Sequence, residues 1–429
     1  MRRVVRMHCM YPLRGVLPGI ELYSGRSKVA VKKDDIAVVE EMNSTYIEDL
    51  KREDLGAYHY LHLPGEGSMP IRALNSPSVM DYLRKVAKLC QLDVQPYITT
   101  KADVELVKEI PGSRLAASRF NLVEDVNNKV FSRKKIFSGG NIKLLPGGCC
   151  DNEAEIRKMA NRLREQKVSK IVVKDPDPYT ASGKGKLGEI RAYNFGDNQF
   201  TKDLLTMIVK YQGFRGKKQL ILEKWHEGVL SSPSVIGHIS PDGRINLIAT
   251  TSQIMESPDR VVYQGSIIPA QVDNSVLLEM FRIFQIVADY LVKRGWIGVF
   301  GIDFIVVDED DKQLVIPTEI NGRYTNSLYL ANVMLRLGLD DWLGYSSNLG
   351  VSVGTTYQTF RDAIGLIDVN HGERIIPFNI DPLHIGRAAV MILIDPRLVA
   401  FPVQRAEAIV EDLKSLLLPG LRHYELAYS

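Results

Sequence analysis

Four polar residues stand close together in an otherwise apolar part of the chain. Asp303 lies inside Gly298-Val-Phe-Gly-Ile-Asp-Phe-Ile-Val-Val307, and Glu319, Asn321 and Arg323 alternate with other residues just beyond. Alternating residues of a strand share one face, so two carboxylates, an amide and a guanidinium converge if both segments are strands. Carboxylates are preferred ligands of Mg²⁺, with waters and substrate phosphates completing its coordination. An arginine beside them can stabilise charge on a transferring phosphoryl group or a tetrahedral intermediate.

The same four residues also have a purely structural interpretation. Two buried ion pairs, or the exposed face of a strand, would bring carboxylates and an arginine together as well. A charged aspartate in so apolar a strand is costly to bury unless it is paired or bound to a metal. Asp303 alone therefore leaves both interpretations open.

A lysine at the end of a strand, followed by a glycine-rich basic loop, forms a second candidate site. Lys174 ends Ile171-Val-Val-Lys174, and Ser182-Gly-Lys-Gly-Lys186 comes next. Glycine lets backbone N–H groups approach an anion, which suits a phosphate. The Walker A sequence GxxxxGK[ST] is absent, and a flexible surface hairpin is the better interpretation of the loop taken alone.

The third candidate is Leu220-Ile-Leu-Glu-Lys-Trp-His-Glu-Gly228, a strand that ends in acidic and aromatic residues. Adenine requires a backbone donor and acceptor between apolar faces, and such a hinge offers them. A plain strand end is the simpler interpretation of this segment by itself.

The hydrophobic periodicity predicts the elements that must position these residues. Short β-rich runs alternate with helical patterns in the first quarter of the chain, which is typical of an α/β layer domain. The predicted helices cover Ser76–Cys90, Lys101–Glu109, Glu153–Gln166, Val276–Lys293, Asn326–Leu337 and Gln404–Leu417. The predicted strands cover Lys28–Val31, Ile36–Val39, Tyr58–Leu63, Lys170–Lys174, Gln219–Glu223, Ser234–Ile239, Ile245–Thr251, Gly298–Val307, Gln313–Ile320 and Ala388–Ile394.

The bulk composition excludes several classes of protein. The 429 residues are 45% hydrophobic with a formal charge of +3, which is ordinary globular composition and calls for neither nucleic acid nor a membrane surface as partner. Four cysteines without a metal-binding CxxC pair argue against a disulfide framework. No segment reaches the ~18–20 apolar residues that span a bilayer. We expect a cytoplasmic, soluble protein, with a homodimer as the default assembly.

Taken in order, the three segments resemble the ATP-grasp superfamily, over Asn127 to about Asn326. The resemblance is most specific at Glu319-Ile-Asn-Gly-Arg323. It implies that Asp303, Glu319 and Asn321 hold one or two Mg²⁺ ions (or Mn²⁺), and that Arg323 stabilises the acyl-phosphate and tetrahedral stages. The nucleotide-binding residues implied by the resemblance are Lys129, Lys174, the lid loop Ser182, Gly183, Lys184 and Gly185 (with Lys184 also catalytic), and the adenine hinge Glu223, Lys224 and Trp225.

The sequence departs from the superfamily pattern at two points. The acidic residue that commonly holds the ribose is not obvious after the hinge, and Glu227 is a candidate that comes early. Pro317 lies within the strand that carries Glu319, and because proline cannot donate to a ladder it predicts an edge strand or a bulge there.

The resemblance also implies the fold and the division of the chain. The fold class is α/β and α+β, an ATP-grasp fold with an N-terminal α/β domain and a C-terminal α+β extension. The expected boundaries are residues 1–125 for the N-terminal domain, 126–225 for the small lid subdomain, 226–345 for the large subdomain with the magnesium site, and 346–429 for the extension. Within the superfamily, Asn127–Arg133, Thr250–Gln253 and Tyr263–Ala270 are similar to the pheganomycin-type peptide ligases and the butirosin-pathway ligase that loads glutamate onto an acyl carrier protein.

The implied reaction joins a carboxylate, as an amino acid or peptide, to an amine through an acyl phosphate, giving ADP and phosphate. Either substrate is a small molecule, a peptide or a group on a carrier protein. An ATP-dependent kinase and a non-catalytic nucleotide-binding module are the alternatives. A metal hydrolase is a weaker one, because His59 and His62 fall on opposite faces of a strand and the other histidines are scattered.

Overall fold

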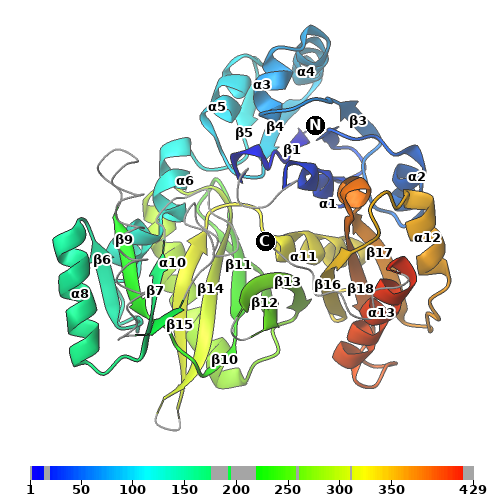
Figure 1. Ribbon diagram of the computed structural model, residues 1–429. Coiled ribbons are helices and arrows are strands. Elements are labelled where there is room, and N and C mark those ends of the chain that lie inside the picture. The colour runs from blue at the N-terminus through cyan, green and yellow to red at the C-terminus, as the bar shows by residue number, and fades with distance from the viewer. Residues whose placement is uncertain are drawn as a thin grey trace.

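The computed structural model describes residues 2–13, 20–174, 192–194, 219–257, 260–309 and 312–418. The described strands form three sheets, one in the N-terminal part, a small one in the middle of the chain, and a large one that continues into the C-terminal part (Figure 1). The mixture of helices with parallel and antiparallel sheets confirms the predicted fold class.

The N-terminal sheet is parallel and has the order β3-β2-β1-β4-β5 among the described strands. Its strands are β1 (Arg2–Met7), β2 (Ile36–Val39), β3 (His59–His62), β4 (Gln91–Pro96) and β5 (Ser113–Leu115). Its helices include α2 (Ser44–Arg52), α3 (Met69–Leu74), α4 (Pro77–Leu89) and α5 (Lys101–Lys108). The sequence predicted α4 and α5 within one residue at each end. Pro77 stands at the first helical position of α4, and a Thr100 capping box starts α5.

The predicted strand at Lys28–Val31 is wrong. These residues form α1 (Ser27–Ala30), which follows the 3₁₀ helix η2 (Ile20–Arg26). The alternating Lys-Val-Ala-Val pattern resembles a strand, but Lys28 is fully buried and its Nζ lies 2.6 Å from Asp381 Oδ1, on a residue distant in sequence. A long-range partner has overridden the local preference.

The small sheet is antiparallel and is covered on one side by α8 (Figure 1). Its strands are β6 (Gly147–Cys150), β7 (Lys170–Lys174), β8 (Ala192–Asn194) and β9 (Leu220–Lys224). The helices before and within it are α6 (Phe120–Asn127), α7 (Lys129–Phe131), η3 (Ser132–Ile136) and α8 (Glu153–Glu165). Asn152 caps α8 by accepting a hydrogen bond from the Glu155 backbone N–H.

The large sheet carries most of the predicted chemistry. Its described strands are β10 (Val229–Ser231), β11 (Pro233–Ile239), β12 (Ile245–Ser257), β13 (Arg260–Ile268), β14 (Gly298–Glu309), β15 (Lys312–Asn321), β16 (Leu343–Gly350), β17 (Glu373–Asn379) and β18 (Arg387–Ile394). They run in the order β10-β14-β11-β12-β13-β16-β18-β17, and β15 pairs with β14. Helix α10 (Asn274–Lys293) packs on one face, where Phe284 stacks on Phe300 at 5.4 Å between ring centroids. Because Phe300 and Asp303 are an odd number of residues apart, Asp303 lies on the opposite face.

The C-terminal strands belong to the same sheet as the strands before them. β16 pairs with both β13 and β18, so the predicted large subdomain and the predicted C-terminal extension share one sheet. The helices α12 (Tyr357–Gly365) and α13 (Pro402–Leu417) lie beside this sheet (Figure 1). One hydrophobic core runs continuously from Met280 under α10 to Leu417 of α13. The predicted domain boundaries stay a prediction. No described helix has the length and apolar character required to cross a bilayer.

Candidate functional site

Asp303 and Glu319 face each other across the pairing of β14 with β15. The two strands are antiparallel, with Asp303 opposite Glu319 and Gly301 opposite Asn321. The register shifts between Asp303 and Phe304, where Pro317 stands, and among the described strands β15 pairs with β14 alone. The bulge and the edge that the proline predicted are therefore both present, and the shift brings Glu319 into line with Asp303 rather than displacing it.

Asp303 is half-buried in a set of hydrogen-bond donors. Its Oδ1 accepts from Ser234 Oγ at 2.6 Å, and its Oδ2 accepts from Asn321 Nδ2 at 2.8 Å. Burial and the neighbouring charge of Glu319 raise the pKa of Asp303, against the opposing effects of Ser234 and Arg323. Ser234 lies directly opposite Asp303 on β11. Sequence reasoning missed it, because a serine in a strand carries no mark of its partner.

Glu319 responds to its surroundings in the opposite direction. Burial would raise its pKa, but the positive charges of Lys129 and Arg323 outweigh that effect and lower the pKa. Lys129 Nζ lies 3.0 Å from Glu319 Oε2. Two adjacent carboxyl groups thus have pKa values moved apart, a pattern that is common where carboxylates do different chemical work.

Arg323 reaches this site from a loop, not from the strand. β15 ends at Asn321, so the alternation that predicted a shared strand face stops two residues before the arginine. Arg323 Nη1 instead donates to Asn127 Oδ1 at 2.8 Å, and the same oxygen accepts from the Gly322 N–H at 3.0 Å. A Cβ on Gly322 would lie 2.6 Å from a ring carbon of Trp296, which explains the glycine in Glu-Ile-Asn-Gly-Arg.

Asn127 therefore orients Arg323, and sequence reasoning gave it no role. Its Nδ2 also donates to Val123 O at 2.8 Å, inside α6. The one sequence signal for such a role was the position of Asn127 two residues before Lys129. One short segment thus supplies both a candidate phosphate-binding lysine and the hydrogen-bond acceptor for Arg323.

The second cluster lies on the small sheet, around Glu223. This carboxylate is buried and forms ion pairs with Arg133 and with Lys174, whose Nζ is 2.6 Å from Oε2. The charge of Lys174 also contributes to the lowered pKa of Glu319, so the small-sheet and large-sheet clusters act on one another. Arg133 is a further residue that the sequence did not assign.

The predicted adenine hinge has its backbone donors engaged within the protein. The Lys224 N–H donates to Pro146 O at 2.8 Å, and the Trp225 N–H donates to Lys170 O at 2.9 Å. Contacts from Lys224 and Trp225 to a base would use other atoms of these residues. Glu227, the ribose candidate, is exposed and pairs with Lys170.

The predicted lid loop lies outside the described residues. Ser182, Gly183, Lys184 and Gly185 all belong to it. The sites that can be compared with the structure are therefore the β14–β15 cluster and the Glu223 cluster.

The residues at β14–β15 fit a divalent cation that is shared with a phosphate. Asn321 Oδ1 is buried and has no hydrogen-bond partner within the described structure, and an amide oxygen beside Asp303 and Glu319 is a suitable hard ligand. No group of three or more His, Cys, Asp or Glu side chains in the described residues is arranged to hold a metal. Two carboxylates and one amide suit Mg²⁺, which commonly keeps waters and binds substrate phosphates instead of filling an all-protein cage.

The adjacent thiols on β6 do not form a second reactive centre. Burial raises the pKa of both, and that of Cys150 reaches about 12. A thiolate is the nucleophilic form of cysteine, so neither is activated at neutral pH. Cys149 and Cys150 are free.

Comparison with known proteins identifies the middle of the chain. Residues 158–327 match the family model described as ATP-grasp domain. This segment contains Lys174, Glu223 and the four residues of the β14–β15 cluster, but it does not include Lys129.

Two curated relatives are ligases. The chain is 25% identical to the [butirosin acyl-carrier protein]–L-glutamate ligase of Niallia circulans over 266 residues. These residues cover 62% of this chain and 59% of the relative. Over 128 residues the chain is 30% identical to the L-propargylglycine–L-glutamate ligase of Streptantibioticus cattleyicolor, 29% of this chain and 25% of that one. The matches thus span less than two thirds of the length of either relative.

Solved structures share the fold over almost the whole chain. An ADP complex of N5-carboxyaminoimidazole ribonucleotide synthetase superposes with a TM-score of 0.58 at 12% identity, covering 96% of this chain and 97% of that one. A biotin carboxylase complex from Campylobacter jejuni gives a TM-score of 0.58 at 12% identity, covering 92% and 86%. At such identity the likeness establishes the fold, which extends beyond residues 158–327 to the N-terminal and C-terminal parts.

Proposed function

We propose that this chain, which carries an ATP-grasp domain at residues 158–327 within an ATP-grasp fold, is an ATP-dependent carboxylate–amine ligase. The main support for this proposal is the β14–β15 cluster. There the charges of Asp303, Glu319 and Arg323 act on one another, and Lys129 Nζ lies 3.0 Å from Glu319 Oε2. Such a set of charges can stabilise a phosphoryl group during its transfer. A reaction of this kind requires no covalent enzyme nucleophile.

The reaction has two balanced steps. An oxygen of the substrate carboxylate attacks the γ-phosphorus of ATP, and the bond to the β-phosphate oxygen breaks, which gives an acyl phosphate and ADP. The amine nitrogen then attacks the acyl carbon, phosphate leaves with the carbon–oxygen electron pair, and the nitrogen loses a proton to give an amide. Catalysis comes chiefly from positioning and from stabilisation of developing charge.

The proposed roles follow from the contacts. Asp303, Glu319 and the Asn321 carbonyl hold Mg²⁺, which neutralises phosphate charge when it is bound. Lys129 and Lys174 bind phosphate oxygens, because both are half-buried and both contribute to the field at Glu319. Arg323, fixed by Asn127, faces the charge that develops at the transferring phosphoryl and acyl groups.

The substrates we propose are an amino acid or peptide as acid and an amine that is free or carried by a protein. Both curated relatives have L-glutamate in their names, one with an acyl carrier protein and one with L-propargylglycine. L-glutamate is therefore the first compound to test on either side of the reaction.

The test measures phosphate and ADP release by the purified chain with Mg·ATP and pairs of amino acids. We expect release that requires a carboxylate and that rises with an amine. Hydroxylamine in place of the amine should trap the acyl phosphate as a hydroxamate. A phosphorylated product that resists hydroxylamine, with no free phosphate, would identify a kinase instead, and nucleotide binding without any turnover would identify a binding module.

A further inference from the structure

Arg26 is a buried cation for which the described structure offers no carboxylate. Its side chain is 3% exposed, and its guanidinium donates to two amide oxygens, those of Asn326 and, at 3.3 Å, of Asn348. Its Nε is buried and has no partner among the described residues. Burial lowers the pKa of Arg26, which shows that its charge is held in a poorly solvated place. A buried charge without a counter-ion is costly.

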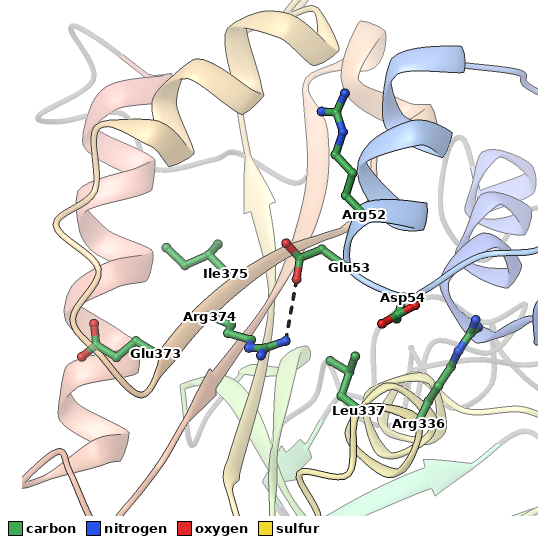
Figure 2. A pocket seen from close by; sticks show the side chains of 8 residues that line it. All are labelled: Arg52, Glu53, Asp54, Arg336, Leu337, Glu373, Arg374 and Ile375. Atoms are coloured by element: carbon green, nitrogen blue, oxygen red, sulfur yellow. Dashed lines mark ion pairs between the residues drawn. The ribbon is translucent and has the colours of Figure 1, made fainter.

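Two other cations of the described structure have carboxylate partners. Lys28, two residues on, lies 2.6 Å from Asp381, and Arg405 lies 2.8 Å from Glu373. The cavity of about 640 Å³ in Figure 2 likewise mixes signs, with Arg374 paired to Glu53 at its wall. Among the described residues, Arg26 therefore differs from Lys28 and Arg405 in having two amide oxygens in place of a carboxylate.

Aromatic rings, not anions, surround the Arg26 guanidinium. It lies 4.3 Å from the centroid of the Tyr23 ring and 5.2 Å from that of Phe378. Burial raises the pKa of Tyr263 and of Tyr329, which are also near it, so both phenols stay neutral at physiological pH. The rings shape a dry wall that strengthens any ion pair formed there, and they leave the positive charge unbalanced.

A continuous row of polar side chains connects Arg26 with the metal-binding candidate. The strand registers place Asp303 opposite Ser234, Gln253 opposite Ser266, and Ser266 opposite Ser346. Gln253 Nε2 donates to Ser234 Oγ at 2.9 Å, and Asn348 is two residues from Ser346 on the same strand face. The row thus crosses from β14 through β11, β12 and β13 to β16 on one face of the large sheet.

The length of this row sets the size of what could span it. Neighbouring strands are ~4.8 Å apart, so the four strand spacings from β14 to β16 amount to roughly 19 Å. The metal, the transferring phosphate and the Arg26 side chain occupy part of that span. The remainder suits an amino acid or a short peptide.

The same place is where the N-terminal sheet meets the large sheet. β1 and β4 are neighbours at the point where the strand order of the parallel sheet reverses, and ligands bind outside the carboxyl ends of such strands. His8 follows β1 and Tyr97 follows β4, and the Tyr324 N–H donates to Tyr97 O at 2.9 Å. α11 (Asn326–Leu337) begins there with its partly positive N-terminus, which favours an anion.

We propose that Arg26, Asn326 and Asn348 bind the non-reacting carboxylate of an amino-acid or short-peptide substrate. This inference rests on the proposed ligase function and names the substrate end that the enzyme recognises. The reacting group then lies toward Arg323, and the polar row supports the chain between the two ends.

The sharpest test supplies the missing carboxylate from within the protein. Asn348→Asp places an anion beside Arg26 with little change in shape, and Arg26→Gln removes the charge. Kinetics are measured with the acid and amine pair that best stimulates phosphate release by the wild-type chain. We expect both variants to raise the KM of one of these two substrates roughly 10- to 100-fold, the loss expected for a charge-assisted hydrogen-bonded pair. The KM for ATP should stay unchanged and kcat should change little. Asn348→Asp should also raise Tm.

Arg336→Gln is the matched control, since Arg336 is an enclosed arginine that donates to the backbone oxygens of Val31 and Gly56. It should alter stability without altering either KM. A higher Tm for Asn348→Asp with both KM values unchanged would mean that Arg26 is only structural and would overturn the inference. Asn348→Asp decides the question alone if Arg26→Gln does not fold. Absence of any stimulated phosphate release by the wild-type chain would contradict the ligase itself, which is a separate result.

Discussion

Two aspartates, Asp103 and Asp303, both have a pKa raised by burial, yet they lie in different surroundings. Asp103 is 1% exposed at the start of α5, and its pKa rises to about 6. Its Oδ2 accepts hydrogen bonds from the Thr100 N–H at 2.8 Å and from Thr100 Oγ1 at 2.6 Å, while its Oδ1 has no partner among the described residues. All of these contacts are local to one capping box.

Asp303 is half-buried and its contacts are long-range. They come from β11 and β15, and its charge is coupled to that of Glu319 beside it. A raised pKa is therefore no mark of a functional site by itself. The distinguishing feature is a second carboxyl group whose pKa moves the other way, with lysine and arginine charges that belong to neither strand.

The largest effect expected from this difference is the loss of turnover when the charges around Asp303 are removed. Glu319→Ala and Arg323→Ala should each lower kcat for phosphate release by roughly 10³-fold or more, because the cation and the developing charge lose their partners. Circular dichroism and Tm should show that both variants stay folded. Near-normal ligation by both variants would contradict the assignment of the β14–β15 cluster.

Asp103 gives an intermediate effect, on stability alone. Its pKa is about 6 in the folded chain and ~3.9 when unfolded. Between these values the folded state holds a proton that the unfolded state has lost, so the free energy of unfolding falls as pH rises from about 4 through 6. The full loss is about 3 kcal/mol.

Asp103→Asn should remove this pH dependence, since the amide keeps an acceptor for Thr100 and has no charge. Urea unfolding at pH 4.5 and pH 7 measures it, and the variant should gain stability relative to the wild type as pH rises. Phosphate release should stay within about twofold of the wild type, because Asp103 lies outside the β14–β15 cluster. Parallel stability profiles for the two proteins would show that Asp103 ionises as it does in the unfolded chain.

The sequence predicted what depends on local pattern. Hydrophobic periodicity predicted α4, α5, α8, α10 and α11 closely, and it predicted that the segments carrying Asp303 and Glu319 are strands. Pro317 predicted the bulge, because a missing N–H is a local property. The sequence failed where a distant residue decides the outcome: Lys28 is helical and buried because Asp381 pairs with it.

The same limit applies within the candidate site. Glu319 and Arg323 were identifiable from their spacing, but Asn127 and Ser234 were not, since each acts through a contact with a residue far along the chain. An asparagine or a serine is common enough that its type alone predicts nothing. The charged members of the β14–β15 cluster are thus predictable, and the neutral residues Asn127 and Ser234 that contact them depend on the tertiary structure.

Ser234→Ala tests such a neutral residue and gives the smallest expected effect. The hydroxyl donates to Asp303 at 2.6 Å and accepts from Gln253 at 2.9 Å. Loss of this hydroxyl removes one hydrogen-bond donor from the Asp303 carboxylate. We expect this to cost about 1–1.5 kcal/mol, which is roughly tenfold in cation affinity. We expect this to raise the Mg²⁺ concentration needed for half-maximal phosphate release, while the fold and the KM for the carboxylate substrate stay nearly unchanged.

Ser252→Ala is the matched control for this variant. Ser252 is equally a buried serine of the large sheet, but its hydroxyl accepts from the Gln271 N–H at 2.9 Å, and its position next to Thr251 turns it to the opposite face. It should lose stability on a similar scale and leave the Mg²⁺ dependence as it is. Equal Mg²⁺ dependence in both variants would mean that hydrogen bonding to Asp303 matters no more than any buried hydroxyl, and that Asp303 resembles Asp103 after all. A difference confined to Ser234→Ala would instead tie cation binding to the hydrogen bond that Ser234 donates to Asp303, a contact from a residue with no charge of its own.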